Sequence, residues 1–220
     1  MWPWETENGR AWLLLNVALL LLLAGVRVGD ARGAVLLSEV LPDPASDWNG
    51  DGSFSSRDDE WVEIVNTGPA PVDLADYWLS DALGEEAQLR LSGSLAPGET
   101  ALFTGAAAVA WQQANGITVT GLSLNNSGDQ LELHLGDPLL PGATLVDALI
   151  YPAHVGVDDR TLARMLPEDE WVLCDALSPY GGDLEPSGTG CPPTPGAWNV
   201  CEGLVPAEHR SWGEVKAEYR

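Results

Sequence analysis

Short apolar runs separated by turn-forming residues are the feature that most constrains the fold of this chain. From residue 34 onward these runs alternate with clusters of Gly, Pro, Asn and Asp. Many short strands at near-regular spacing are typical of an all-β sandwich or barrel. A parallel α/β fold would need a helix after most strands, and residues 106–114 form the one good helical stretch. The sequence therefore predicts an all-β, antiparallel β-sandwich with one short helix. The expected strands are residues 34–40, 60–66, 72–74, 77–80, 88–91, 100–104, 130–135, 144–151 and, more weakly marked, 161–166.

The strand over residues 60–66 shows how the two faces are assigned. Trp61, Glu63 and Val65 fall on one face, and Val62 and Ile64 fall on the other. Because successive side chains of a strand point to opposite faces, Val62 and Ile64 are expected in the core. Trp61 is expected to be partly exposed on the other face.

An apolar segment near the N-terminus indicates export. Residues 11–28 are rich in Leu, Arg10 precedes them, and small residues at Ala31 and Gly33 mark a plausible cleavage region. This is the anatomy of a signal peptide, here assigned to residues 1–33. The uninterrupted apolar run is shorter than the roughly 20 residues of a spanning helix, but an uncleaved anchor is the alternative. Either arrangement places the rest of the chain outside the cytoplasm, secreted or at the cell surface.

The three cysteines, Cys174, Cys191 and Cys201, agree with export. They contain no C-x-x-C motif, so neither a zinc ribbon nor a redox motif is indicated. In an oxidising compartment one disulfide is expected, with one thiol left over. A Cys191–Cys201 pair is favoured because the residues between them are rich in Pro and Gly, and a Cys174–Cys191 pair is the next choice. Three unpaired cysteines are the remaining alternative.

The charge balance excludes one class of partner. The chain has 33 acidic and 10 basic residues, a net charge of −23, and only four arginines lie between Gly33 and Glu208. Proteins that bind nucleic acid need a basic surface to neutralise phosphates. No nucleic-acid partner is expected, whereas an acidic surface is compatible with solubility and with divalent cations.

A series of short phrases occurs in order along the chain: Leu37-Ser38-Glu39-Val40, Asp59 to Gly68, Pro71-Val72-Asp73-Leu74, Tyr77 to Asp81, Leu95 to Glu99, Gly121 to Asp129, Val146-Asp147 with Ile150-Tyr151, and Pro195 to Asn199. This series resembles the bacterial lamin tail domain, an immunoglobulin-like β-sandwich. The resemblance covers residues 34–199 and rests on the order of the phrases, since each alone is common. It implies a mostly non-catalytic domain of secreted or surface proteins, found beside nucleases, proteases or adhesive repeats.

One polar loop has the spacing of a calcium site. Asp47, Asn49 and Asp51 take positions 1, 3 and 5 of a twelve-residue loop, the Ser53 carbonyl takes position 7, and Asp58 takes position 12. Gly52 stands at position 6, where the chain must turn sharply. The loop resembles the dockerin version, which has Asp at position 12, although no helix flanks it. The sequence thus predicts a weak Ca²⁺ site, with a plain surface turn as the alternative.

These features favour a non-catalytic, exported structural, adhesive or protein-interaction module, stabilised by Ca²⁺. The alternative is a carbohydrate- or polymer-binding module that serves a partner enzyme and stacks sugars on Trp61, Trp78 or Trp111. A hydrolase that uses scattered carboxylates is the least favoured reading, because no catalytic motif accompanies them. The expected organisation is a leader over 1–33, the sandwich over 34–200 and a tail over 201–220, which is either frayed or a short amphipathic helix.

Overall fold

The computed structural model describes residues 35–81, 87–179 and 185–201 of the 220-residue chain. All of them belong to one compact unit. Within this described part, no helix has the length and apolar character needed to cross a membrane. The expected leader over 1–33 and the tail after Cys201 lie outside the described residues.

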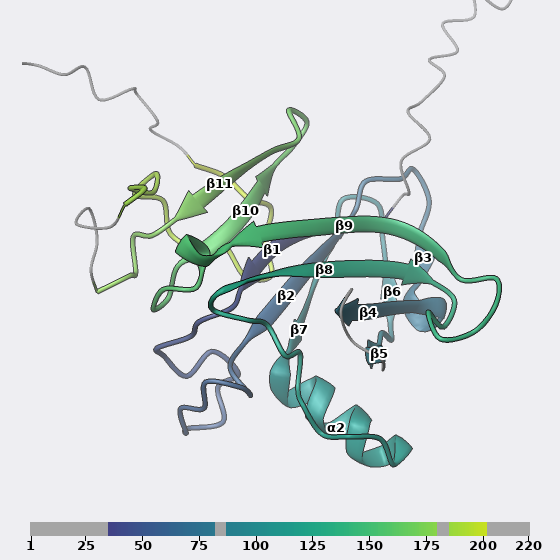
Figure 1. Cartoon of the computed structure of the whole chain (residues 1–220). Helices are drawn as coiled ribbons and strands as arrows, with labels where there is room; N and C mark the ends of the chain where they lie inside the picture. The colour runs from purple at the N-terminus through teal and green to yellow at the C-terminus, as the bar shows by residue number, and fades with distance from the viewer. Residues whose placement is uncertain (1–34, 82–86, 180–184, 202–220) are drawn as a thin grey trace, which may run out of the picture. The chain divides into compact units, whose positions relative to one another are not determined.

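Two antiparallel sheets build the fold (Figure 1). The first sheet has the strand order β11-β10-β1-β2-β7. Its strands are β1 (Val35–Leu41), β2 (Trp61–Asn66), β7 (Thr100–Thr104), β10 (Thr161–Met165) and β11 (Glu170–Cys174).

The second sheet has the order β5-β4-β8-β9, and a two-stranded ribbon pairs β3 with β6. The helix α2 (Gly105–Asn115) follows β7, begins at an N-cap in which the Thr104 hydroxyl accepts a hydrogen bond from the Ala107 amide, and ends at Gly116 in the left-handed conformation. The remaining elements are β3 (Val72–Asp73), the 3-10 turn η1 (Leu74–Asp76), β4 (Tyr77–Asp81), β5 (Ala87–Arg90), β6 (Ser94–Leu95), β8 (Gly128–Leu135), β9 (Thr144–Pro152) and the 3-10 turn η2 (Ala153–Val155).

The hydrophobic core lies between the two sheets. Val62 and Ile64 of β2 are fully buried there, as expected from the alternation of that strand, and Leu131 and Leu133 of β8 meet them from the other sheet. The structure thus confirms the predicted all-β, antiparallel sandwich with one helix. Two short strands, β6 and β11, were not predicted.

A bulge in β1 sets the direction of its side chains. The register with β2 shifts between Leu37 and Glu39, so Ser38 has no residue opposite it. Val35, Leu37 and Val40 all face the core, whereas Glu39 stands beside Glu63. A regular strand would have turned Glu39 to the same side as Leu37. The extra residue therefore keeps a carboxylate out of the hydrophobic core.

The prediction that Trp61 is partly exposed is wrong. Trp61 is 0% exposed, and the ring of Trp48 lies 5.8 Å from it in a tilted arrangement. Glu63 and Val65, on the same face of β2, are buried as well. The reason is that loops from distant parts of the chain cover the outer face of this sheet. Alternation within one strand carries no information about such a cover.

Candidate functional site

The loop predicted to bind calcium is organised by its own side chains. The two carboxylate oxygens of Asp47 accept hydrogen bonds from the amides of Gly50 and Gly52, at 2.8 and 2.9 Å. The Asn49 side chain accepts one from the Asp51 amide, and Asp51 accepts one from the Ser53 amide. Gly52 has a φ of +88°, the turn geometry that position 6 of such a loop requires. The structure therefore brings the first three predicted ligands and Ser53 into one exposed turn.

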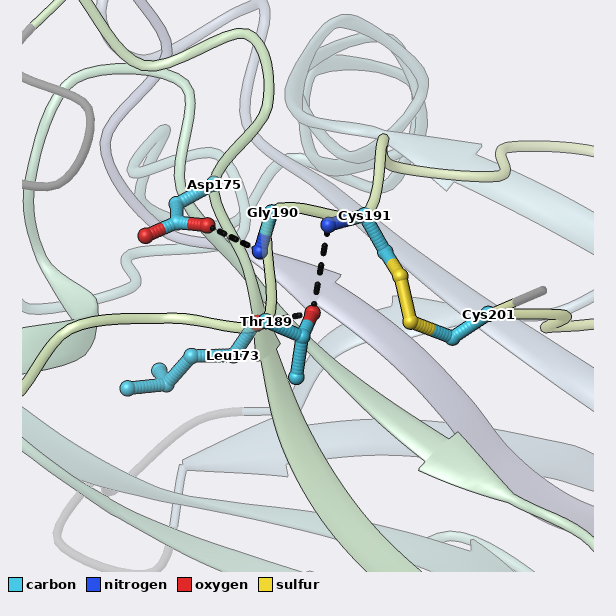
Figure 2. Close-up of a disulfide and its surroundings, with 6 residues drawn as sticks. All are labelled: Leu173, Asp175, Thr189, Gly190, Cys191 and Cys201. Carbon is cyan, nitrogen blue, oxygen red and sulfur yellow. Dashed lines mark hydrogen bonds between the residues drawn. A yellow bond between two sulfur atoms is a disulfide. The ribbon is translucent and has the colours of Figure 1, made fainter. Parts of the chain in front are cut away.

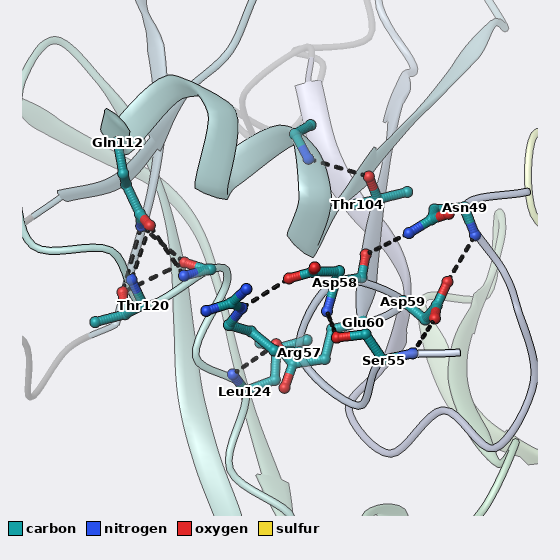
Figure 3. A network of polar contacts seen from close by, with 12 residues as sticks. Asn49, Ser55, Arg57, Asp58, Asp59, Glu60, Thr104, Gln112, Thr120 and Leu124 are labelled. Carbon is teal, nitrogen blue, oxygen red and sulfur yellow. Dashed lines mark hydrogen bonds and ion pairs between the residues drawn. The ribbon is translucent and has the colours of Figure 1, made fainter. Parts of the chain in front are cut away.

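The fifth predicted ligand, Asp58, contacts this group only through its carbonyl oxygen, which accepts a hydrogen bond from the Asn49 side chain at 3.4 Å. Its carboxylate pairs with the Arg57 guanidinium at 2.7 Å, as Figure 3 shows. The next residue, Asp59, is fully buried and accepts hydrogen bonds from the amides of Trp48, Asn49 and Ser55. Asp59 is thus the acid that ties the loop to the domain. Among the residues that the structure describes, no three or more His, Cys, Asp or Glu side chains form a group that could hold a metal ion.

Buried acids gather at the end of the sandwich beside this loop, and no pattern in the sequence predicts them there. Burial, together with the nearby charges of Asp129 and Asp43, raises the pKa of Glu60 to about 8. The Glu60 carboxylate accepts a hydrogen bond from the Leu124 amide at 3.3 Å (Figure 3). Asp159 accepts three hydrogen bonds from the start of the loop, donated by the Ala45 amide, the Ser46 hydroxyl and the Trp48 indole. These acids hold loops in place.

The disulfide joins Cys191 to Cys201, the pairing that the sequence favoured, and leaves Cys174 as a buried free thiol. The segment before it is held by Asp175, whose carboxylate accepts a hydrogen bond from the Gly188 amide at 2.8 Å. It also accepts one from the Gly190 amide at 2.9 Å (Figure 2). Burial raises the pKa of the Cys174 thiol to about 12, so this thiol stays protonated.

We call residues 191–201 the clip, because they cross the outer face of the first sheet and are bonded to it. The buried carboxylate of Glu39 accepts hydrogen bonds from the amide and the hydroxyl of Thr194, at 3.1 and 3.0 Å. Glu63 accepts one from the Gly196 amide at 2.5 Å. Asn199 donates to the carbonyl oxygens of Ser38 and Arg164. The clip is thus fixed to β1, β2 and β10.

Two buried arginines also bind distant segments of the chain to one another. Arg164 of β10 contacts Asp147 of β9 at 2.6 Å and donates to the Leu37 carbonyl at the bulge of β1. Asp147 in turn accepts a hydrogen bond from the Leu37 amide. Arg160 lies 3.5 Å from Asp175 and donates to two backbone carbonyl oxygens. Buried charges of this kind are tolerated when they are paired and hydrogen-bonded, and here they connect segments that are distant in sequence.

The three tryptophans proposed for sugar stacking have different environments. Trp61 is buried, whereas Trp78 and Trp111 are partly exposed and meet edge to face, with ring centres 5.6 Å apart. The guanidinium of Arg90 lies 5.7 Å from the Trp78 ring. Trp111, but neither of the other two, lines a cavity of about 430 Å³.

The fold and the site together define an immunoglobulin-like sandwich. Its buried polar side chains bind the loops and the clip that cover the sheets. Residues 29–149 match the family of the lamin tail domain, and the chain belongs to that family. The resemblance drawn from the phrases of the sequence is therefore confirmed over this range. The family is one of non-enzymatic, immunoglobulin-like domains, which are associated with protein interactions. No curated protein matches the chain.

Proposed function

We propose that this chain is an exported, non-catalytic lamin tail module that binds another protein outside the cytoplasm or at the cell surface. The observation that carries the proposal is that buried ionisable side chains bind the segments that cover the sheets. Glu39, Glu63, Asp59 and Arg164 each hold a loop or strand in the described structure. Their bonds support the reading of the sandwich as a rigid scaffold that presents its surface to a partner.

Export is supported by two independent features. Residues 1–33 have the composition of a signal peptide, and Cys191 and Cys201 are joined in a disulfide, which persists in oxidising compartments. The test is fractionation of producing cells, followed by alkylation of the denatured full chain with a maleimide polymer. We expect the chain outside the cytoplasm with one reactive thiol, from Cys174. A cytoplasmic chain with three reactive thiols would contradict export.

Protein binding is tested by chemical crosslinking on intact producing cells, with the adducts of the full chain identified by mass spectrometry. We expect a discrete adduct with an exported or surface protein, absent from cells that lack the chain. If the chain is recovered only as a monomer at every crosslinker concentration, the interaction role is wrong.

Calcium stabilisation is a further part of the proposal. It is supported by the convergence of Asp47, Asn49 and Asp51 on one turn and by the positive φ of Gly52. Asp58 would have to leave Arg57 to complete the predicted ligand set, or Asp59 would take its place. A bound ion would fix the exposed turn against the buried Asp59, and the expected affinity is weak, in the range of extracellular modules.

A further inference from the structure

A groove lies where the edges of the two sheets meet beside helix α2. Its volume is about 430 Å³, and its lining is mostly apolar. Leu89 of β5 and Leu91, directly after that strand, form buried parts of the wall. Phe103 comes from β7, and Ala107 and Trp111 come from successive turns of α2. Apolar pockets with a few placed polar groups are typical of ligand sites.

Arg90 is the charged group of this groove, and its position is fixed. Its Nε donates to the Ala75 carbonyl at 2.6 Å, and its guanidinium lies 5.7 Å from the ring of Trp78. Trp78 is itself braced edge to face against Trp111. The cation is therefore held at the groove by these two contacts.

The charge of Arg90 stands out in this acidic domain. In the described part of the chain, Arg160 and Arg164 are buried against carboxylates, and Arg57 contacts Asp58 at 2.7 Å. The nearest acid to Arg90 is Asp76, at 4.0 Å and with a side chain that is 82% exposed, so this pair is weak. A groove that pairs apolar walls with this cation is complementary to a ligand that carries both an apolar group and an acid.

The strand next to the groove has an open edge. β7 is the last strand of its sheet, and no described strand pairs with its far side. The hydrogen bonds from the Gly105 amide to Glu60 and from the Asn66 amide to Glu99 fix which residues face β2. By alternation, the peptide groups of Leu102 point toward the open side. An extended chain can add to such an edge while its side chains enter a neighbouring pocket.

We propose that this groove binds an extended segment of the partner protein in which an apolar side chain stands next to a carboxylate. The apolar side chain lies between Leu91, Phe103 and Trp111, the carboxylate pairs with Arg90, and the main chain runs along β7. This inference rests on the proposed function as a protein-interaction module, and it specifies the surface and the partner's chemistry.

The test uses two synthetic peptides, acetyl-Asp-Phe-Asp-Leu-Asp-amide and its Asn counterpart, acetyl-Asn-Phe-Asn-Leu-Asn-amide. Each is titrated into the ¹⁵N-labelled full chain, and the indole N–H signal of Trp111, assigned with Trp111→Phe, is followed. We expect saturable shifts with the acidic peptide. We expect about tenfold weaker binding of the Asn peptide, the loss that corresponds to one charge-assisted hydrogen bond.

Two pairs of variants localise the effect. Arg90→Gln should weaken binding of the acidic peptide by about tenfold, whereas Arg57→Gln, which removes the other exposed arginine of the described domain, should not. Ala107→Glu should abolish binding by placing a carboxylate in the groove, and Ala110→Glu, at an exposed position of the same helix outside the lining, should not. Both alanines are exposed, so the folded state is retained and is checked by circular dichroism.

Three outcomes would overturn the proposal. The first is equal binding of the two peptides. The second is an equal loss of binding in Arg57→Gln and Arg90→Gln. The third is a shift of the Trp111 signal by cellohexaose and by neither peptide. The last outcome would make the groove a carbohydrate site. A failure of the peptide titration leaves the crosslinking test of the proposed function unaffected, because an adduct formed through another face would still appear.

Discussion

Glu39 and Glu63 stand directly opposite each other on β1 and β2, with both carboxylates buried beneath the clip. Burial raises the pKa of both groups, that of Glu63 to about 7, and the charge of Glu39 contributes to the shift of Glu63. The two acids are like charges in a site with little water. At neutral pH the folded state therefore holds protons that the unfolded chain has released.

This pair makes stability depend on pH. Because the folded pKa values are above the unfolded value near 4.5, the folded state binds more protons between about pH 4.5 and 7, and the free energy of unfolding falls as pH rises through this range. We expect Glu63 to contribute on the order of 2 kcal/mol to this loss from pH 5 to pH 8. Glu60, whose pKa is raised to about 8, should add to the loss in the same direction. Glu63→Gln should reduce this loss, whereas Glu170→Gln, at an exposed position, should leave it unchanged. Urea unfolding at both pH values measures the difference, and a stability that rises toward pH 8 would contradict it.

Gln112 should be the most important polar side chain of α2. Its amide donates to the carbonyl oxygens of Gln88 and Gly121 and accepts from the amides of Thr120 and Gly121. Replacing it with alanine leaves several buried backbone groups without partners, so we expect Gln112→Ala to destabilise the fold by about 3 kcal/mol. Gln113→Ala, at the adjacent exposed position, is the matched control and should change the free energy of unfolding by less than about 0.5 kcal/mol. Equal effects in the two variants would argue against this network.

The three cysteines should differ in thiol reactivity and in their contribution to the stability of the fold. Cys174 is 2% exposed, and its raised pKa keeps it as a thiol, so it should react with Ellman's reagent only after unfolding. Cys191→Ser with Cys201→Ser should destabilise the fold by about 2.5 kcal/mol, the loop-closure value for a loop of this size. Cys174→Ala removes a small buried group and should cost less. Rapid reaction of one thiol in the native protein would show that Cys174 is accessible.

Calcium should raise the melting temperature of the full chain if the loop over Asp47–Asp58 binds it. Asp51→Ala should abolish the rise, because it removes a ligand and the acceptor of the Ser53 amide. Asp76→Ala, at a highly exposed acid outside the loop, should keep it. Differential scanning fluorimetry with calcium chloride and with excess chelator measures each rise. A rise of the same size in Asp51→Ala would exclude this loop as the site.

The sequence was sufficient to predict the elements whose pattern is local. The strands that contain Val62 and Ile64, or Leu131 and Leu133, show a period of two, and both pairs face the core. The strand β11 was missed, although the turn before it, which ends at Asp169 with a φ of +64°, separates two short apolar runs and is a usable hairpin signal.

The polar interior depends on contacts that no local pattern contains. Glu39 faces Glu63 only because Ser38 forms a bulge, and Thr194, which bonds Glu39, is 155 residues away in the sequence. Asp59, and not the predicted Asp58, anchors the loop because Asp59 lies next to the buried start of β2. Spacing rules describe ligands along a chain, whereas burial decides which of two adjacent acids points inward.

The closure of the clip by Cys191 and Cys201 has a mechanical consequence. A tension applied at Cys201 passes across the sulfur–sulfur bond directly to Cys191. The segment before Cys191 is bound to β11 by the hydrogen bond from the Thr189 amide to the Leu173 carbonyl. Residues 192–200 are bypassed, so the hydrogen bonds of Thr194, Gly196 and Asn199 carry none of the load. A module tethered by its C-terminal end would thereby keep the outer face of its first sheet covered while being pulled.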